Sequence, residues 1–68
     1  MPRYTADDDF SIYLILAQRA YVGMDFSRAA QWAEAARRIA ISADDDRGAV
    51  FALACAKLAR LVARLVTG

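Results

Sequence analysis

The stretch from Arg47 to Val66, RGAVFALACAKLARLVARLV, constrains the fold more than any other part of this chain. On a helix, successive residues point about 100° apart, and the side chains of this stretch then separate into three sectors. A helix that is apolar over so much of its circumference should be covered on two sides, because one packed face would leave the other in water. The bulky ridge consists of Phe51, Cys55, Leu58, Val62 and Leu65. The alanine seam consists of Ala49, Ala52, Ala56, Ala59 and Ala63. The basic strip consists of Lys57, Arg60 and Arg64.

The alanine seam predicts a close contact between helices, because small side chains let two helix axes approach more closely than the usual separation of about 8–10 Å. Residues 26–41 carry small residues at the same heptad spacing, so we expect the two sets to pair. We also predict that the alanine seam is the interface between two copies of the chain, with the third helix packing within and between subunits. The small residues of the second helix are Ala29, Ala33, Ala36 and Ala40.

The length of the chain favours self-association. A single domain of 68 residues rarely gains more than about 3–5 kcal/mol from its core without further support. One cysteine excludes an intramolecular disulfide, and a chain without histidine is not expected to hold a structural zinc ion. Oligomerisation remains, and an apolar fraction of 59% supplies surface for it. We therefore predict a homodimer.

Local patterns predict a single all-α domain over residues 1–68, built from a helical hairpin and a longer C-terminal helix. The helices are expected at about residues 6–22, 26–41 and 43–66, where apolar residues recur at helical spacing. Glu34 and Arg38 stand in the favourable order for an i, i+4 ion pair on the second helix.

The helix ends carry recognisable signals. Thr5, Asp25 and Ser42 are the expected N-caps, because their side-chain oxygens can accept hydrogen bonds from the first free backbone N–H groups. Gly23 is expected to end the first helix in a left-handed conformation. The eight residues from Ser42, SADDDRGA, echo TADDDFSI from Thr5 at a distance of 37 residues. This echo indicates either a repeated helix pair or two similar acid-rich caps.

Residues 10–41 resemble a tetratricopeptide-type helical hairpin. In the frame of that motif, aromatic and small residues of the first helix fall at Tyr13, Leu16, Ala17 and Ala20, and small residues of the second helix at Ala29 and Ala36. The chain departs from the motif at Ala33, where a large residue is typical, and at Ile41, where proline is typical. The resemblance implies a concave groove that binds a protein or peptide.

Catalysis and metal binding have little support in the sequence. The acid triplets Asp7–Asp9 and Asp44–Asp46 are the only candidates, but neighbouring helical carboxylates point about 100° apart and cannot converge on one ion. The chain has no histidine and no Gly-rich phosphate loop. We expect no catalytic residue, no metal and no cofactor, and we interpret the triplets as helix caps that complement the helix dipole.

Charge is distributed unevenly along the chain. Residues 1–46 hold eight acids and five bases, whereas residues 47–68 hold four bases and no acid. The acidic part of one subunit could face the basic strip of another, or the late bases could simply complement a helix dipole. A membrane span is not expected, because each base of the strip would cost about 2.5–3.5 kcal/mol in a bilayer. The candidate partner-binding residues are Trp32, Arg37, Arg38, Lys57, Arg60 and Arg64.

These patterns favour a non-catalytic protein–protein interaction module. We expect a small adaptor, regulator or inhibitor that binds a larger protein, and its size would suit a phage- or plasmid-encoded inhibitor. The alternative is an accessory nucleic-acid-binding protein that uses the Arg/Lys strip, although a pI near 7.9 is low for that class. Trp32 could equally be ordinary core, and the strip could be merely solvated. The lack of an export signal and a free Cys55 predict a cytoplasmic location.

Overall fold

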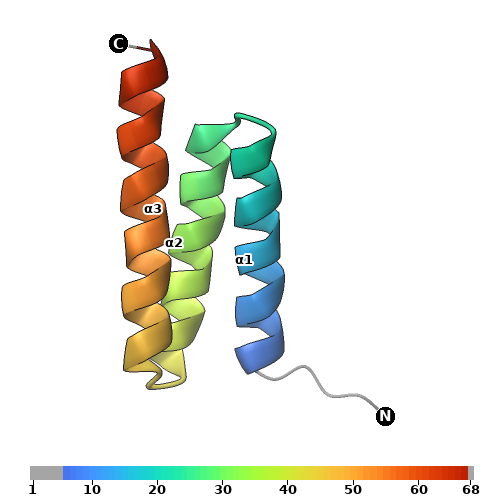
Figure 1. The fold of residues 1–68 in the computed structure, drawn as a ribbon. Coiled ribbons are helices and arrows are strands. Elements are labelled where there is room, and N and C mark those ends of the chain that lie inside the picture. Colours follow the sequence, from blue (N-terminus) through green and yellow to red (C-terminus); the bar gives the residue numbers. More distant parts are fainter. Residues whose placement is uncertain (1–5, 68) are drawn as a thin grey trace.

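The computed structural model describes residues 6–67, which form three α-helices and no strand. Helix α1 spans Ala6–Val22, α2 spans Phe26–Ser42 and α3 spans Asp46–Thr67. This confirms the predicted all-α class and the order of a hairpin followed by a longer helix. The third helix begins three residues later than expected. α2 lies between the other two helices and runs antiparallel to both (Figure 1).

The three helices lie side by side in one layer. α1 and α3 each pack along α2 and hardly touch one another, so α2 is the only helix with neighbours on two sides. The molecule measures 45 × 24 × 12 Å along its principal axes, so it is thinnest in one direction. Helices usually bury their apolar stripes between two packed layers, and residues 6–67 provide no second layer.

Alanine makes the core. Among residues 9–66, whose burial the structure describes, every buried apolar residue is an alanine, and none is more than 7% exposed. Ala17, Ala33 and Ala56 form a cluster that joins all three helices, and Ala59 packs with alanines of α2 in a second cluster. This confirms that the small residues of the second and third helices pair. The buried alanines are Ala17, Ala29, Ala30, Ala33, Ala36, Ala40, Ala52, Ala56 and Ala59.

The large apolar side chains lie outside this core. Of the bulky ridge, Phe51, Leu58 and Leu65 are 58%, 52% and 75% exposed, while Cys55 and Val62 are half-buried. Within one chain, α3 is therefore covered on one side only, not on the two sides that its apolar circumference predicts. The reason is the single layer, since α2 can cover only the alanine seam.

The two turns share one geometry, which differs from the prediction at both. Met24 and Asp44, not Gly23, take the left-handed conformation, with φ of 65° and 55°. The next residue caps the following helix: the Asp25 carboxylate accepts a hydrogen bond from the Arg28 N–H at 3.2 Å, and the Asp45 carboxylate accepts one from the Gly48 N–H at 3.0 Å.

The predicted cap at Asp25 is thus confirmed, whereas Ser42 is the last residue of α2 and does not cap α3. Asp45 takes that role because the chain needs three residues to reverse direction between α2 and α3. Thr5, the expected cap of the first helix, lies outside the described residues, as do the side chains of Asp7 and Asp8.

Gly48 is the close-approach position of the second turn. A Cβ atom there would lie 3.3 Å from the Ala40 Cβ and would collide with the Asp45 carboxylate that caps α3. The missing side chain therefore lets the start of α3 approach the end of α2.

We expect Met24→Gly to stabilise the protein by up to about 1 kcal/mol. A left-handed conformation costs a residue with a Cβ roughly 1–2 kcal/mol, and the greater freedom of glycine in the unfolded chain offsets part of that gain. Gly23→Ala is the matched control: its φ is not positive and the new Cβ would lie 3.4 Å from the Arg19 carbonyl oxygen, so we expect no loss of stability. Urea unfolding followed by circular dichroism measures both. A destabilised Gly23→Ala and an unchanged Met24→Gly would contradict the observed turn.

We expect Ala56→Leu to destabilise the protein by about 1–3 kcal/mol, because Ala56 is fully buried where the three helices meet and a larger side chain must push them apart. Lys57→Leu places the same side chain at the exposed neighbouring position and should leave the unfolding free energy nearly unchanged. Equal unfolding midpoints for the two variants would show that the helices are not in close contact.

Candidate functional site

An apolar groove runs between α1 and α3. Its volume is about 380 Å³, within the range of about 300–1,000 Å³ that is usual for binding pockets. Ala29 and Ala33 of α2 form its floor. The walls come from Leu14, Ile15, Ala17, Gln18 and Tyr21 of α1 and from Phe51, Cys55 and Leu58 of α3.

The groove exists because the side chains of its floor are small and most of those in its walls are large. Alanines of α2 bring α1 and α3 close to the middle helix, while bulky side chains project from both outer helices beside that floor. Ile15 on the α1 wall is 52% exposed, as is Leu58 on the α3 wall. Exposed aliphatic side chains that face one another across a groove are typical of a surface that a partner covers.

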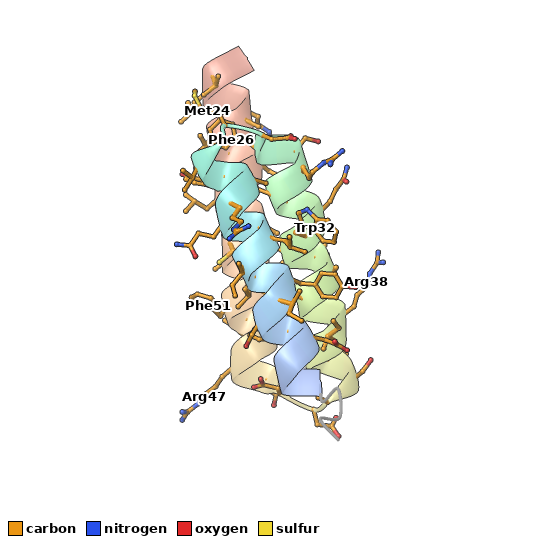
Figure 2. The ribbon with its side chains drawn as sticks, turned by 90° about the vertical axis from the view of Figure 1, so that its right-hand side faces the viewer. Met24, Phe26, Trp32, Arg38, Arg47 and Phe51 are labelled. Carbon is orange, nitrogen blue, oxygen red and sulfur yellow. The ribbon has the colours of Figure 1, made fainter. Side chains whose placement is uncertain are left out.

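The two faces of the helix layer differ in character. Phe51 lies on one side of the molecule, and Trp32 and Arg38 lie on the opposite side (Figure 2). Trp32 stacks on Tyr13 with ring centroids 5.4 Å apart and also packs against the alanine cluster of the core. Its ring thus helps to hold α1 on α2, and the structure places it away from the groove.

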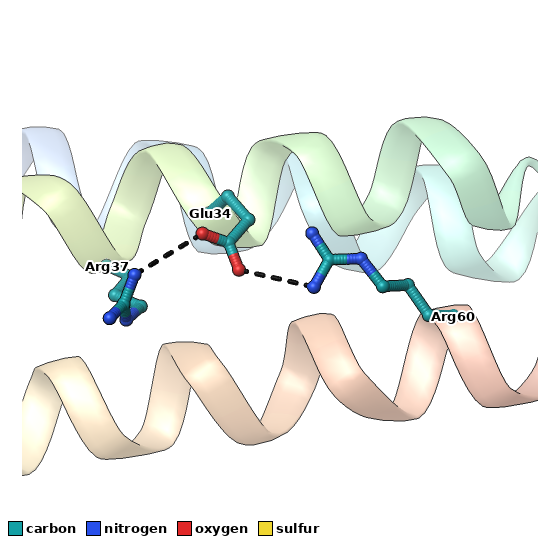
Figure 3. A network of polar contacts seen from close by, with 3 residues as sticks. All are labelled: Glu34, Arg37 and Arg60. Atoms are coloured by element: carbon teal, nitrogen blue, oxygen red, sulfur yellow. Dashed lines mark hydrogen bonds and ion pairs between the residues drawn. The ribbon is translucent and has the colours of Figure 1, made fainter.

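Glu34 organises the basic residues between α2 and α3 (Figure 3). One carboxylate oxygen lies 3.5 Å from an Arg37 guanidinium nitrogen, and the other accepts a hydrogen bond from Arg60 at 3.4 Å. The predicted partner of Glu34 is therefore wrong: Arg38 points away from α3, on the outer side of α2, whereas Arg37 lies beside α3. The side chains of Lys57 and Arg64 form no ion pair within the described residues.

The structure brings together only part of the predicted partner-binding set. Arg60 and Arg64 line a shallow hollow between α2 and α3, beside Ser27 and Gln31. Lys57 is exposed on the same helix. Arg38 and Trp32 lie elsewhere, so the six residues do not form one surface.

The alanine seam is used inside the chain. Ala52, Ala56 and Ala59 are at most 1% exposed, and Ala49 and Ala63 are half-buried. A second copy could reach the three central alanines only by displacing α2. The three central residues of the predicted interface therefore belong to the contact between α2 and α3, and an interface between copies that involves α3 would use another side of that helix.

The resemblance implied a concave groove, but the sequence did not locate its walls, because they come from α1 and α3, which are far apart in the chain. One residue of α1 carried a signal: Ile15, which lines the groove, is among those that widen the apolar sector of that helix. Cys55, which we interpreted as part of the bulky ridge, lies in the α3 wall as a free thiol.

The described residues contain neither a cluster suited to a metal ion nor a helix suited to span a membrane. Nowhere in residues 6–67 do three His, Cys, Asp or Glu side chains lie close enough together to hold a metal ion. No helix in this part of the chain has both the length and the apolar character needed to span a bilayer. Comparisons of the chain with models of protein families, with curated proteins and with solved structures find no match. The resemblance to a tetratricopeptide hairpin therefore stays a prediction.

We expect Glu34→Gln to lower the free energy of unfolding by about 0.5–1 kcal/mol at low salt, because two partly exposed ion pairs lose their acid. The loss should shrink in concentrated sodium chloride, which screens the wild-type pairs. Arg38→Gln removes a charge that pairs with nothing in the described region and serves as the control. Equal effects of the two substitutions at both salt concentrations would contradict the assigned pairing.

Proposed function

We propose that this protein is a non-catalytic protein–protein interaction module, a small adaptor, regulator or inhibitor that binds a larger protein through the groove between α1 and α3. The observation that carries the proposal is the chemistry of the groove, whose lining is apolar apart from the Gln18 amide, the Tyr21 hydroxyl and the Cys55 thiol. Apolar surface of this kind favours association, because covering it removes it from water.

The shape of the groove favours an amphipathic helix as the occupant. The groove runs between two parallel helices over a floor of alanines, which leaves room for bulky side chains from above. A helix that presents apolar residues at i, i+3, i+4 and i+7 would fill it and supply the second layer that is missing from residues 6–67. We place this activity in the cytoplasm as part of the same proposal, since a free thiol in a binding surface suits a reducing compartment.

Binding of nucleic acid through the Arg/Lys strip is the weaker hypothesis. Glu34 already pairs with Arg37 and Arg60, which reduces the positive charge available to phosphates. A gel-shift titration across salt concentrations tests it, because phosphate binding weakens steeply as salt rises.

We expect Ile15→Glu to abolish partner binding, since it places a charge in the α1 wall of the groove. Ile12→Glu is the matched control, because Ile12 is exposed on the same helix and does not line the groove. The wild type and both variants are used to capture proteins from the native host, and the captured proteins are compared by mass spectrometry. The relevant partner binds the wild type and Ile12→Glu but not Ile15→Glu.

A second readout uses the native thiol. When the captured partner is added back to wild-type protein, alkylation of Cys55 by iodoacetamide should slow, because the thiol lies in the occupied groove. The proposal fails if every captured protein binds Ile15→Glu as well as it binds the wild type, or if Cys55 reacts at the same rate with and without the partner.

A further inference from the structure

The side of α3 that faces away from α2 carries a second heptad pattern. We call it the outer seam, and its members follow one another at alternating spacings of three and four residues, as in the contact stripe of a coiled coil. All are exposed, with Leu61 and Leu65 at 52% and 75%. The outer seam consists of Phe51, Ala54, Leu58, Leu61 and Leu65.

The outer seam lies opposite the alanine seam. Leu58 follows the buried Ala56 by two residues, which places its side chain about 200° further round the helix. Phe51 and Leu65 are 14 residues apart, so the exposed stripe extends along about 21 Å of α3. A contiguous apolar stripe of this kind is unusual on the surface of a monomer and marks an interaction surface.

We propose that a second copy of this chain docks on the outer seam, with the two α3 helices antiparallel about a two-fold axis. This interface goes beyond the groove: it shares Phe51 and Leu58 with the edge of the α3 wall, whereas Ala54, Leu61 and Leu65 do not line the groove. In an antiparallel pair centred between Ala54 and Leu58, each Leu58 faces the Ala54 of the other copy. Large side chains then meet small ones on both sides of the axis, which is the condition for close packing of a self-complementary surface.

The charges at the ends of α3 favour the same arrangement. Asp46 and Arg64 are 18 residues apart, which is about five helical turns, so they lie along one flank of the outer seam. Both are exposed and neither forms an ion pair in the part of the chain that the structure describes. In an antiparallel pair, Asp46 of each copy lies beside Arg64 of the other.

A parallel pair lacks this complementarity. It would keep Asp46 and Arg64 at opposite ends of the dimer, about 27 Å apart along the helix axis. Lys57 lies on the same flank near the antiparallel axis, and its long side chain can keep the ammonium group in water. The pairing of opposite charges and the pairing of large with small side chains therefore both point to a second copy in the antiparallel orientation.

Sedimentation equilibrium of the full chain tests the dimer. We expect the wild type to have twice the chain mass at micromolar to millimolar concentration, and Leu61→Glu to have the mass of one chain. Leu61 does not line the groove, so circular dichroism of this variant should show a folded helix layer that still binds the groove partner. Ile12→Glu is the control and should remain dimeric. A monomeric wild type, or a Leu61→Glu variant that is still dimeric, would overturn the proposal.

The orientation is tested by exchanging the charges. Arg64→Glu and Asp46→Lys should each weaken dimerisation by roughly threefold to tenfold, since each replaces two attractive contacts by repulsive ones. The double variant should regain the wild-type dissociation constant, because the pairs are re-formed with reversed sign. Additive weakening in the double variant would overturn the antiparallel arrangement.

Discussion

The contact of alanine with alanine across α2 is the interaction on which the rest of this structure depends. Ala33 meets Ala17 of α1 and Ala56 of α3 in one cluster, so the middle helix holds both neighbours with methyl groups. Methyl groups let helices approach closely but bury little apolar area per residue. The stability of one chain therefore depends on a tight fit along α2 more than on the amount of hydrophobic surface removed from water.

A core made of alanines leaves the large apolar residues without a place inside. They line the groove between α1 and α3 and the outer seam of α3, and Phe51 and Leu58 stand where the two surfaces meet. A single helix layer has no second layer to cover these residues. The proposed groove partner and the proposed second copy would supply that cover from different directions, which explains how one short chain could both self-associate and bind another protein.

Polar interactions cap two helices and join α2 to α3, but they do not create the arrangement of the three helices. Asp25 and Asp45 cap α2 and α3, and each follows a residue in the left-handed conformation, so both turns reverse the chain in three residues. Glu34 connects α2 to α3 through Arg60, but partly exposed ion pairs of this kind contribute little to stability. The Glu34–Arg60 pair joins α2 to α3 at one point, while alanine packing supplies the contact itself.

The sequence by itself determined three helices, the cap at Asp25 and the pairing of small residues between the second and third helices, because all of these follow from local spacing. Spacing records where a side chain lies around its own helix, but not which directions neighbouring helices occupy. Only the tertiary structure decided that Cys55 faces the groove while Leu61 faces solvent, that Met24 and not Gly23 is left-handed, and that Glu34 pairs with Arg37 and Arg60. The physical reason is that α2 holds both α1 and α3, which hardly touch each other, and that arrangement is a property of the packed molecule.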